Sequence, residues 1–164
     1  MRRRLMWIVP VLALTLGAPG SAAAQTAPNG WNMAGAPAHS NFSQAEAMFA
    51  WDRTAQAYVD VTEQRGDIGS DAPDCPGYWA YFPAVTAVTL PAPSHSGDTH
   101  TCTLSAGWNL VGNPFSLVAR LPEGLTAYYW SPPAQAYEVI DRIPVGGAAW
   151  VYETAPTTIT ITAL

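Results

Sequence analysis

The chain has 164 residues, with seven arginines, no lysine and twelve acidic residues, and its formal net charge is −5. Proteins bind nucleic acids and anionic membrane surfaces through clusters of cationic side chains, so neither is an expected partner. Schiff-base catalysis is also excluded, because it requires a lysine amine.

Residues 1–24 have the features of an export signal. Three arginines at 2–4 precede an apolar run at 5–16 that is too short to span a membrane, and the alanines at 22–24 fit a cleavage site. Cleavage after Ala24 would leave four arginines against twelve acidic residues, a net charge of −8. We therefore expect an exported protein, in the periplasm, at the cell surface or in the medium, with no membrane insertion after cleavage. A retained signal anchor is the alternative.

The rest of the sequence contains one segment twice. Its first part, Gly-Trp-Asn, stands at 30–32 and again at 107–109, and further matches pair 49–51 with 128–130, 55–58 with 134–137, and 79–81 with 150–152. Such self-similarity is typical of repeated structural units. We predict a first repeat at 25–91, a linker at 92–100 and a second repeat at 101–164. The first copy has extra residues in a loop at 65–76.

Short runs rich in Val, Ile, Thr, Tyr and Trp, separated by Gly, Pro, Asn and Asp, indicate an all-β protein. Two pseudo-symmetric repeats of about five short strands each are expected to form one compact sandwich or barrel-like domain. Ser43 to Glu46 has capping-box spacing for one or two helical turns. In chain order, the strands are predicted near 31–35, 48–51, 58–61, 78–82, 86–90, 101–104, 108–111, 127–130, 137–140, 149–153 and 157–162.

The first repeat has no evident counterpart of the strand at 101–104. We expect the final strand, at 157–162, to occupy that place and close the sheet, since closure protects sheet edges.

Two cysteines, Cys75 and Cys102, remain in a chain with an export signal. An even number of cysteines in an oxidising compartment indicates a disulfide, which would tie the first repeat to the second. A catalytic or metal-binding role has little support, because there is no CxxC sequence and no histidine beside either cysteine.

The Gly-Trp-Asn-Leu-Val-Gly-Asn-Pro sequence at 107–114, with Tyr-x-Trp downstream and Gly-Tyr-Trp-Ala-Tyr at 77–81, resembles the Gly-Trp-Asn-Leu repeat of secreted bacterial and archaeal proteins. The resemblance covers nearly all of the chain after the signal. It departs at 33–34, where Met-Ala replaces Leu-Val or Leu-Ile, and at 148–149, where Ala-Ala replaces Gly-Tyr. It implies an all-β exported module and no catalytic residue.

The tryptophans after the signal fall into equivalent pairs in the two copies. Residues repeated in both units are expected to be those that each unit needs to fold, because an indole brings a large apolar area to a core. The predicted repeat core is Trp31, Trp51, Trp79, Trp108, Trp130 and Trp150.

Aromatic residues that are not repeated are the better candidates for ligand binding. Tyr78 and Phe82 lie four positions apart on a predicted strand, so both are expected to point to one side. Phe115 and Tyr129 complete this candidate set, and Phe42 is also unrepeated.

Acidic residues and histidines suggest two further candidate sites. Asp67, Asp71 and Asp74, in the extra loop, offer oxygen ligands for a cation such as Ca²⁺, but their spacing is not that of an EF-hand. His95, Asp98 and His100 could in principle bind zinc. A solvated acidic loop and a polar linker are the preferred interpretations, and no metal or cofactor is expected.

Taken together, these patterns predict an exported, non-catalytic β module with a structural or protein-interaction role at the cell envelope or outside the cell. The first alternative is a polysaccharide-binding module that uses the unrepeated aromatic residues. The second is a hydrolase with a dispersed site. No Gly-x-Ser-x-Gly, His-Glu-x-x-His, P-loop or GxGxxG sequence is present.

Overall fold

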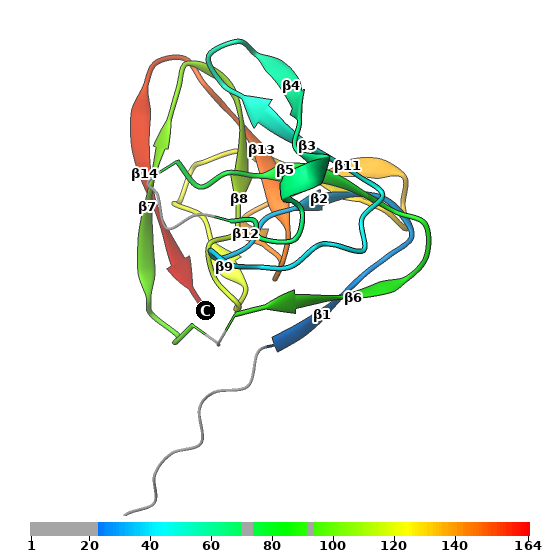
Figure 1. Cartoon of the computed structure of the whole chain (residues 1–164). Helices are drawn as coiled ribbons and strands as arrows, with labels where there is room; N and C mark the ends of the chain where they lie inside the picture. Colours follow the sequence, from blue (N-terminus) through cyan, green and yellow to red (C-terminus); the bar gives the residue numbers. More distant parts are fainter. Residues whose placement is uncertain (1–22, 70–73, 92–93) are drawn as a thin grey trace, which may run out of the picture.

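The computed structural model describes residues 23–69, 74–91 and 94–164 (Figure 1). In these ranges the protein is all-β, with fourteen strands in antiparallel sheets and one 3₁₀ turn, η1 (Thr62–Gln64). None of these residues belongs to a helix that is long and apolar enough to cross a membrane. The short helix expected at Ser43 to Glu46 is absent. These residues form a turn, because the chain must enter a strand directly afterwards.

Each repeat forms a four-stranded sheet with the same strand order. In the first repeat the order is β2 (Gly30–Ala34), β5 (Tyr78–Phe82), β3 (Ala47–Asp52) and β4 (Ala57–Asp60). In the second it is β8 (Gly107–Gly112), β13 (Ala148–Glu153), β10 (Ala127–Ser131) and β11 (Ala136–Ile140). The shared topology confirms the fold class of two like repeats.

A second sheet lies across the core from each of these: two strands in the first repeat and four in the second. In the first repeat, β1 (Ala23–Ala27) pairs with β6 (Thr86–Leu90). In the second, the order is β12 (Arg142–Ile143), β9 (Ala119–Arg120), β14 (Thr157–Ala163) and β7 (Thr99–Leu104). The pairs β1–β6 and β7–β14 occupy equivalent places in the two repeats.

Every strand expected from the sequence is present, but three others were not predicted. β9 and β12 have two residues each, too few for a pattern. β1 lies across the expected cleavage position after Ala24, and its sequence has no apolar alternation. The prediction that residues 157–162 close the sheet of the first repeat is wrong. β14 pairs with β7 and β9 of its own repeat, and β1 occupies the place in the first repeat that corresponds to β7. The expected linker also ends earlier, because β7 begins at Thr99.

Each repeat buries its own apolar core between its two sheets. Alternation along the strands supplies the inward side chains, as expected for strands with two different faces. The first core includes Phe42, Met48, Phe82, Val88 and Leu90. The second includes Leu104, Val111, Val151, Ile159 and Ile161.

The repeats meet through reciprocal backbone contacts. The Gly35 N–H donates to the Gly146 carbonyl at 3.0 Å, and the equivalent Gly112 N–H donates to the Cys75 carbonyl at 2.9 Å. A Cβ on Gly35 would lie 2.4 Å from the Gly112 Cα, so only glycine allows this close approach. Isolated β-bridges repeat the same reciprocity, between Ala34 and Gly147 and between Pro76 and Val111.

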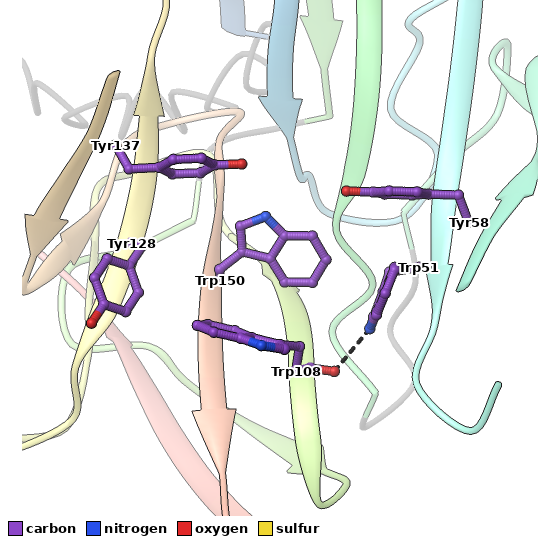
Figure 2. Close-up of a pocket in the computed structure, with 6 residues that line it drawn as sticks. All are labelled: Trp51, Tyr58, Trp108, Tyr128, Tyr137 and Trp150. Atoms are coloured by element: carbon purple, nitrogen blue, oxygen red, sulfur yellow. Dashed lines mark hydrogen bonds between the residues drawn. The ribbon is translucent and has the colours of Figure 1, made fainter. Parts of the chain in front are cut away.

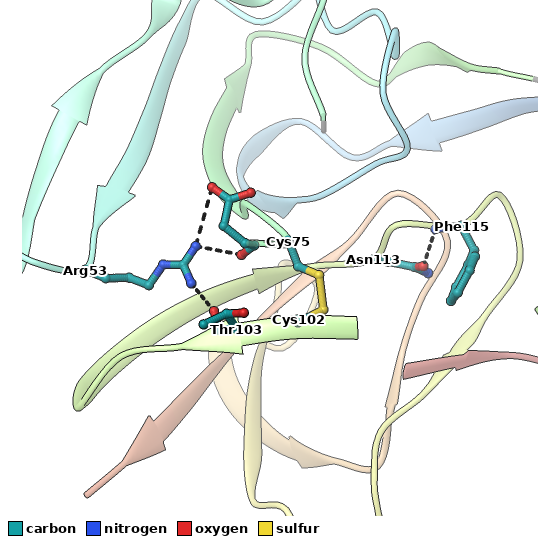
Figure 3. The surroundings of a disulfide bond; sticks show 7 residues. Arg53, Cys75, Cys102, Thr103, Asn113 and Phe115 are labelled. Carbon is teal, nitrogen blue, oxygen red and sulfur yellow. Dashed lines mark hydrogen bonds and ion pairs between the residues drawn. A yellow bond between two sulfur atoms is a disulfide. The ribbon is translucent and has the colours of Figure 1, made fainter. Parts of the chain in front are cut away.

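The predicted disulfide crosses the same junction. Cys75, in the loop before β5, bonds to Cys102 on β7, and both are buried (Figure 3). Arg53 supports this region, since its guanidinium donates to the Thr103 carbonyl and, at 2.7 Å, to the Asp74 carbonyl. Closing a loop of this length stabilises the fold by about 3 to 4 kcal/mol in the loop-entropy treatment. Disulfides of this kind are typical of oxidising, extracytoplasmic compartments.

Candidate functional site

The aromatic residues that occur in both repeats gather in one place. We call them the aromatic cluster. Strand alternation puts them on the outer face of each four-stranded sheet, away from the repeat's own core. In the first repeat the members are Trp31, Phe49, Trp51, Tyr58, Trp79 and Tyr81. In the second they are Trp108, Tyr128, Trp130, Tyr137, Trp150 and Tyr152.

Ring contacts inside the cluster are nearly the same in both copies. Trp31 and Tyr81 have ring centroids 5.3 Å apart, and the equivalent Trp108 and Tyr152 are also 5.3 Å apart. Such tilted and edge-to-face contacts are the favourable geometries for aromatic rings. Three further contacts cross between the repeats. They join Trp150 to Trp51 at 5.0 Å and to Tyr58 at 6.4 Å, and Trp79 to Trp130 at 6.1 Å.

The Gly-Trp-Asn sequence explains how its tryptophan reaches the cluster. Gly107 has a φ of 92°, a conformation that glycine adopts without strain, and it starts β8. The buried Asn109 side chain accepts from the Ser105 N–H at 2.9 Å and donates to the Ser105 and Gly107 carbonyls, which fixes the turn after β7. Trp108, between the glycine and the asparagine, points to the opposite face of the strand. In the first repeat Gly30 also has a positive φ, and the Asn32 side chain donates to the Pro28 and Gly30 carbonyls, but Pro28 has no N–H to donate in return.

The expectation that the repeated tryptophans form the core of each unit is corrected by their burial. Trp150 is only 9 % exposed and lies at the centre of the cluster, but Trp31 and Trp108 are 42 % and 41 % exposed. Trp51, Trp79 and Trp130 are half-buried between the repeats. The reason is that two like units meet through the same face. Residues at the margin of that face are therefore repeated although they do not belong to a core.

The margins of the cluster form two open grooves. The larger, groove A, has a volume of about 550 Å³ and is lined by Trp51, Tyr58, Trp108, Tyr128, Tyr137 and Trp150 (Figure 2). The smaller, groove B, has a volume of about 380 Å³ and is lined by Trp31, Tyr58, Trp79, Trp130 and Tyr137. Each residue of groove B is the repeat equivalent of a residue of groove A. Among the residues that the structure describes, no charged side chain lines either groove.

Two tyrosines belong to both grooves and separate them. Tyr58 and Tyr137 are each 51 % exposed, and their hydroxyls point toward one another above Trp150 (Figure 2). Burial raises the pKa of the Tyr58 hydroxyl above its ordinary value; the Trp79 indole N–H lowers it, and Tyr137 raises it. Within the described residues, the buried Trp79 indole N–H makes no hydrogen bond. This tyrosine pair thus supplies hydroxyl groups on a surface made otherwise of rings.

The hydrogen bonds around the cluster are not symmetric. The Trp51 indole N–H donates to the Trp108 carbonyl at 2.8 Å, and the Trp108 N–H donates to the Gln56 side-chain oxygen at 3.0 Å. The equivalent indole N–H of Trp130 is buried, and within the part of the chain that the structure describes it makes no hydrogen bond. Groove A therefore has the more firmly held wall.

The five unrepeated aromatic residues named above lie elsewhere. Tyr78 and Phe82 do point to one side of β5, as expected, but that side faces the core, and Phe82 is fully buried. Phe115 is buried in the second core. Tyr129 lies on the face of β10 opposite to the cluster, beside a small cavity of about 70 Å³. Burial raises the pKa of Tyr78 and Tyr129. The expectation that Phe82 and Phe115 contact a ligand is corrected, since enclosed side chains are out of a ligand's reach.

Those candidate metal ligands that the structure describes do not form a group of three. The Asp67 carboxylate lies 3.2 Å from His39 and the Asp74 carboxylate lies 3.6 Å from Arg53, while Asp71 lies outside the described residues. His95 and Asp98 form an exposed turn before β7, and His100 lies on that strand. In residues 23–69, 74–91 and 94–164, no group of three or more His, Cys, Asp or Glu side chains is placed to hold a metal ion.

A signal for the grooves was present in the sequence. β5 alternates Trp79 and Tyr81 with Ala80 and Phe82, so it carries apolar side chains on both faces. A strand of that kind must cover something on each side. The sequence could not show whether the second face meets a sheet, a ligand or solvent.

No protein-family model matches this chain, and no similar protein was found among curated proteins or solved structures. The resemblance to the Gly-Trp-Asn-Leu repeat therefore stays a prediction.

Proposed function

We propose that the protein is an exported, non-catalytic module that binds a neutral polysaccharide through the aromatic cluster. The observation that carries this proposal is the pair of equivalent, open grooves lined by tryptophan and tyrosine rings. Ligand sites are typically lined by apolar and aromatic side chains with a few polar groups that set orientation. Here the rings supply the aromatic lining, and the hydroxyls of Tyr58 and Tyr137 supply the polar groups.

A sugar ring suits such a groove for a simple chemical reason. One face of many pyranose rings consists of C–H bonds, which are apolar and slightly positive. The face of an indole or phenol ring is apolar and slightly negative, so the two surfaces attract each other. The absence of a cation among the groove residues favours a neutral sugar over a uronic acid or a sulfated polymer.

The same residues support a role without catalysis. Acid–base and nucleophilic chemistry use carboxylates, imidazoles, thiols or activated hydroxyls within reach of the bound substrate. As far as the chain is described, the lining of grooves A and B includes no Asp, Glu, His, Cys or Ser. The hydrolase alternative therefore has no support at this site.

A protein partner was the first expectation from the sequence, and exposed apolar patches do mark protein interfaces. The equivalence of the two grooves favours a polymer instead. A polysaccharide offers the same unit repeatedly along its length, whereas the surface of a folded partner offers different side chains to each groove.

Affinity electrophoresis and tryptophan fluorescence will test the proposal. The purified protein is titrated with soluble glucan, mannan, xylan and chitin oligosaccharides, with polygalacturonate as the anionic comparison. We expect saturable binding to at least one neutral polymer. Tyr58→Ala should weaken it about tenfold, the equivalent of about 1.4 kcal/mol for one lost ring contact.

The matched control is Val59→Ala, because Val59 is the next residue on β4 and points to the opposite face. It should leave binding unchanged. If no neutral polymer binds, or if Tyr58→Ala binds as well as the unmodified protein, the proposal is wrong.

A further inference from the structure

We propose that a single polysaccharide chain occupies grooves A and B together and crosses the tyrosine pair between them. This inference rests on the proposed function and adds to it how the ligand is held. Its basis is that the grooves are repeat equivalents that share two of their lining residues, Tyr58 and Tyr137.

The shared tyrosines make the two grooves neighbours on one surface. Tyr58 contacts Trp51 in groove A, with ring centroids 5.0 Å apart, and its ring lies 6.4 Å from that of Trp150. Tyr58 also lines groove B, together with Trp79. Tyr137 contacts Trp130 of groove B at 5.3 Å and also lines groove A. A ligand that leaves one groove over these rings therefore enters the other.

Repeated subsites match a repeated ligand. Once one unit of a chain is bound in groove A, the next units are held close to groove B, so the second contact forms at a high effective concentration. No such gain in affinity is available to a sugar that is too short to pass the tyrosine pair.

The grooves also differ from one another, and this difference sets the order in which they bind the chain. Groove A is larger, and the Tyr128 ring lines it, whereas the equivalent Phe49 does not line groove B. Groove A should hold the first unit.

The test uses one variant for each groove. Trp108 lines groove A alone and Trp31 lines groove B alone, and the two are repeat equivalents with nearly equal exposure. Isothermal titration calorimetry measures binding to the unmodified protein, Trp31→Ala and Trp108→Ala. The ligands are linear gluco-, manno- and N-acetylgluco-oligosaccharides of increasing length. Val139→Ala is the control, since Val139 is 69 % exposed on β11 and lines neither groove.

We expect the affinity of the unmodified protein to rise at least about tenfold at one particular chain length, with one chain bound per protein. Trp31→Ala should lose that rise and keep the affinity for short oligosaccharides. Trp108→Ala should weaken binding at every length. Val139→Ala should behave as the unmodified protein. Trp31→Phe and Trp108→Phe keep an aromatic ring at each site, so each should weaken binding less than the alanine variant does. This comparison separates loss of a ring contact from loss of folding.

Other results would overturn the inference. Affinity that does not depend on length, or two long chains bound per protein, would show that the grooves act separately while polysaccharide binding itself stands. Saturable binding of poly-L-proline, lost in the same variants, would assign the grooves to a proline-rich peptide, since such peptides also dock between aromatic rings. Absence of binding to any saccharide would overturn the proposed function together with this inference.

Discussion

At the scale of single residues, each of the three residues of the Gly-Trp-Asn sequence has its own task. Gly107 adopts a positive φ, Asn109 fixes the turn from inside, and Trp108 stands on the outer face. The sequence suggested that the tryptophan was kept in both copies for folding. The structure assigns that task to the asparagine and leaves Trp108 partly exposed at a groove.

Tyrosine titration gives a test at this scale. The pKa values of Tyr58, Tyr78 and Tyr129 are raised, mainly because burial disfavours the charged phenolate. The unfolded chain loses these protons near the ordinary tyrosine pKa of about 10. Their contribution to stability is therefore complete below about pH 10, and it is lost as the pH rises through the folded-state pKa values. We expect the urea midpoint to fall in that range.

Tyr58→Phe removes one of the three groups, so the fall in the urea midpoint should become smaller. The tyrosinate absorbance of the folded protein should lose one late-titrating component as well. If the absorbance of the unmodified protein shows no component above the ordinary tyrosine range, the assignment is contradicted.

At the scale of elements, the β3–β4 and β10–β11 hairpins are equivalent in sequence and in register but not in their contacts. Gln56 and Gln135 both have a φ of 50° in the turn, and both donate to a carbonyl three residues earlier. Only Gln56 reaches the other repeat, where its side chain forms hydrogen bonds with the N–H and the carbonyl of Trp108. The repeat in the sequence predicted both hairpins and could not predict this difference.

We expect Gln56→Ala to lower the free energy of unfolding by about 1 kcal/mol more than Gln135→Ala does, because two hydrogen bonds between the repeats are lost only in the first variant. The backbone strain at positive φ is the same in both, so it cancels in the comparison. Chemical denaturation of the two variants measures the difference. Equal destabilisation would mean that Gln56 does not connect the repeats.

At the scale of the whole molecule, two sandwiches are fused through one near-symmetric junction. Gly35 and Gly112 bring the two backbones into contact there, and the Cys75–Cys102 bond covalently joins the repeats nearby. The aromatic cluster fills the rest of the interface. Its margins are left open as grooves because the two sheets meet only in part.

The junction can be tested with one added methyl group. A Cβ on Gly112 would lie 2.3 Å from the Pro76 carbonyl oxygen, and backbone cannot move aside as a flexible side chain can. Gly112→Ala should lower the free energy of unfolding by about 1 to 3 kcal/mol. Gly66→Ala is the control, because nothing lies within 4 Å of its Cβ position, and its effect should stay within about 0.5 kcal/mol. Similar urea midpoints for the two variants would argue against a tight junction.

The sequence by itself determined the all-β class, the two repeats, the main strands and the disulfide, because these depend on local alternation, turn residues and the number of cysteines. It did not determine β1 or the partner of β14, since strand pairing is a long-range property and β1 has no pattern of its own. Only the tertiary structure decided which face carries the grooves. Repetition marks residues that are needed at the same place in each unit, but the contact between the units decides whether that place is a core, as for Trp150, or an exposed groove, as for Trp31 and Trp108.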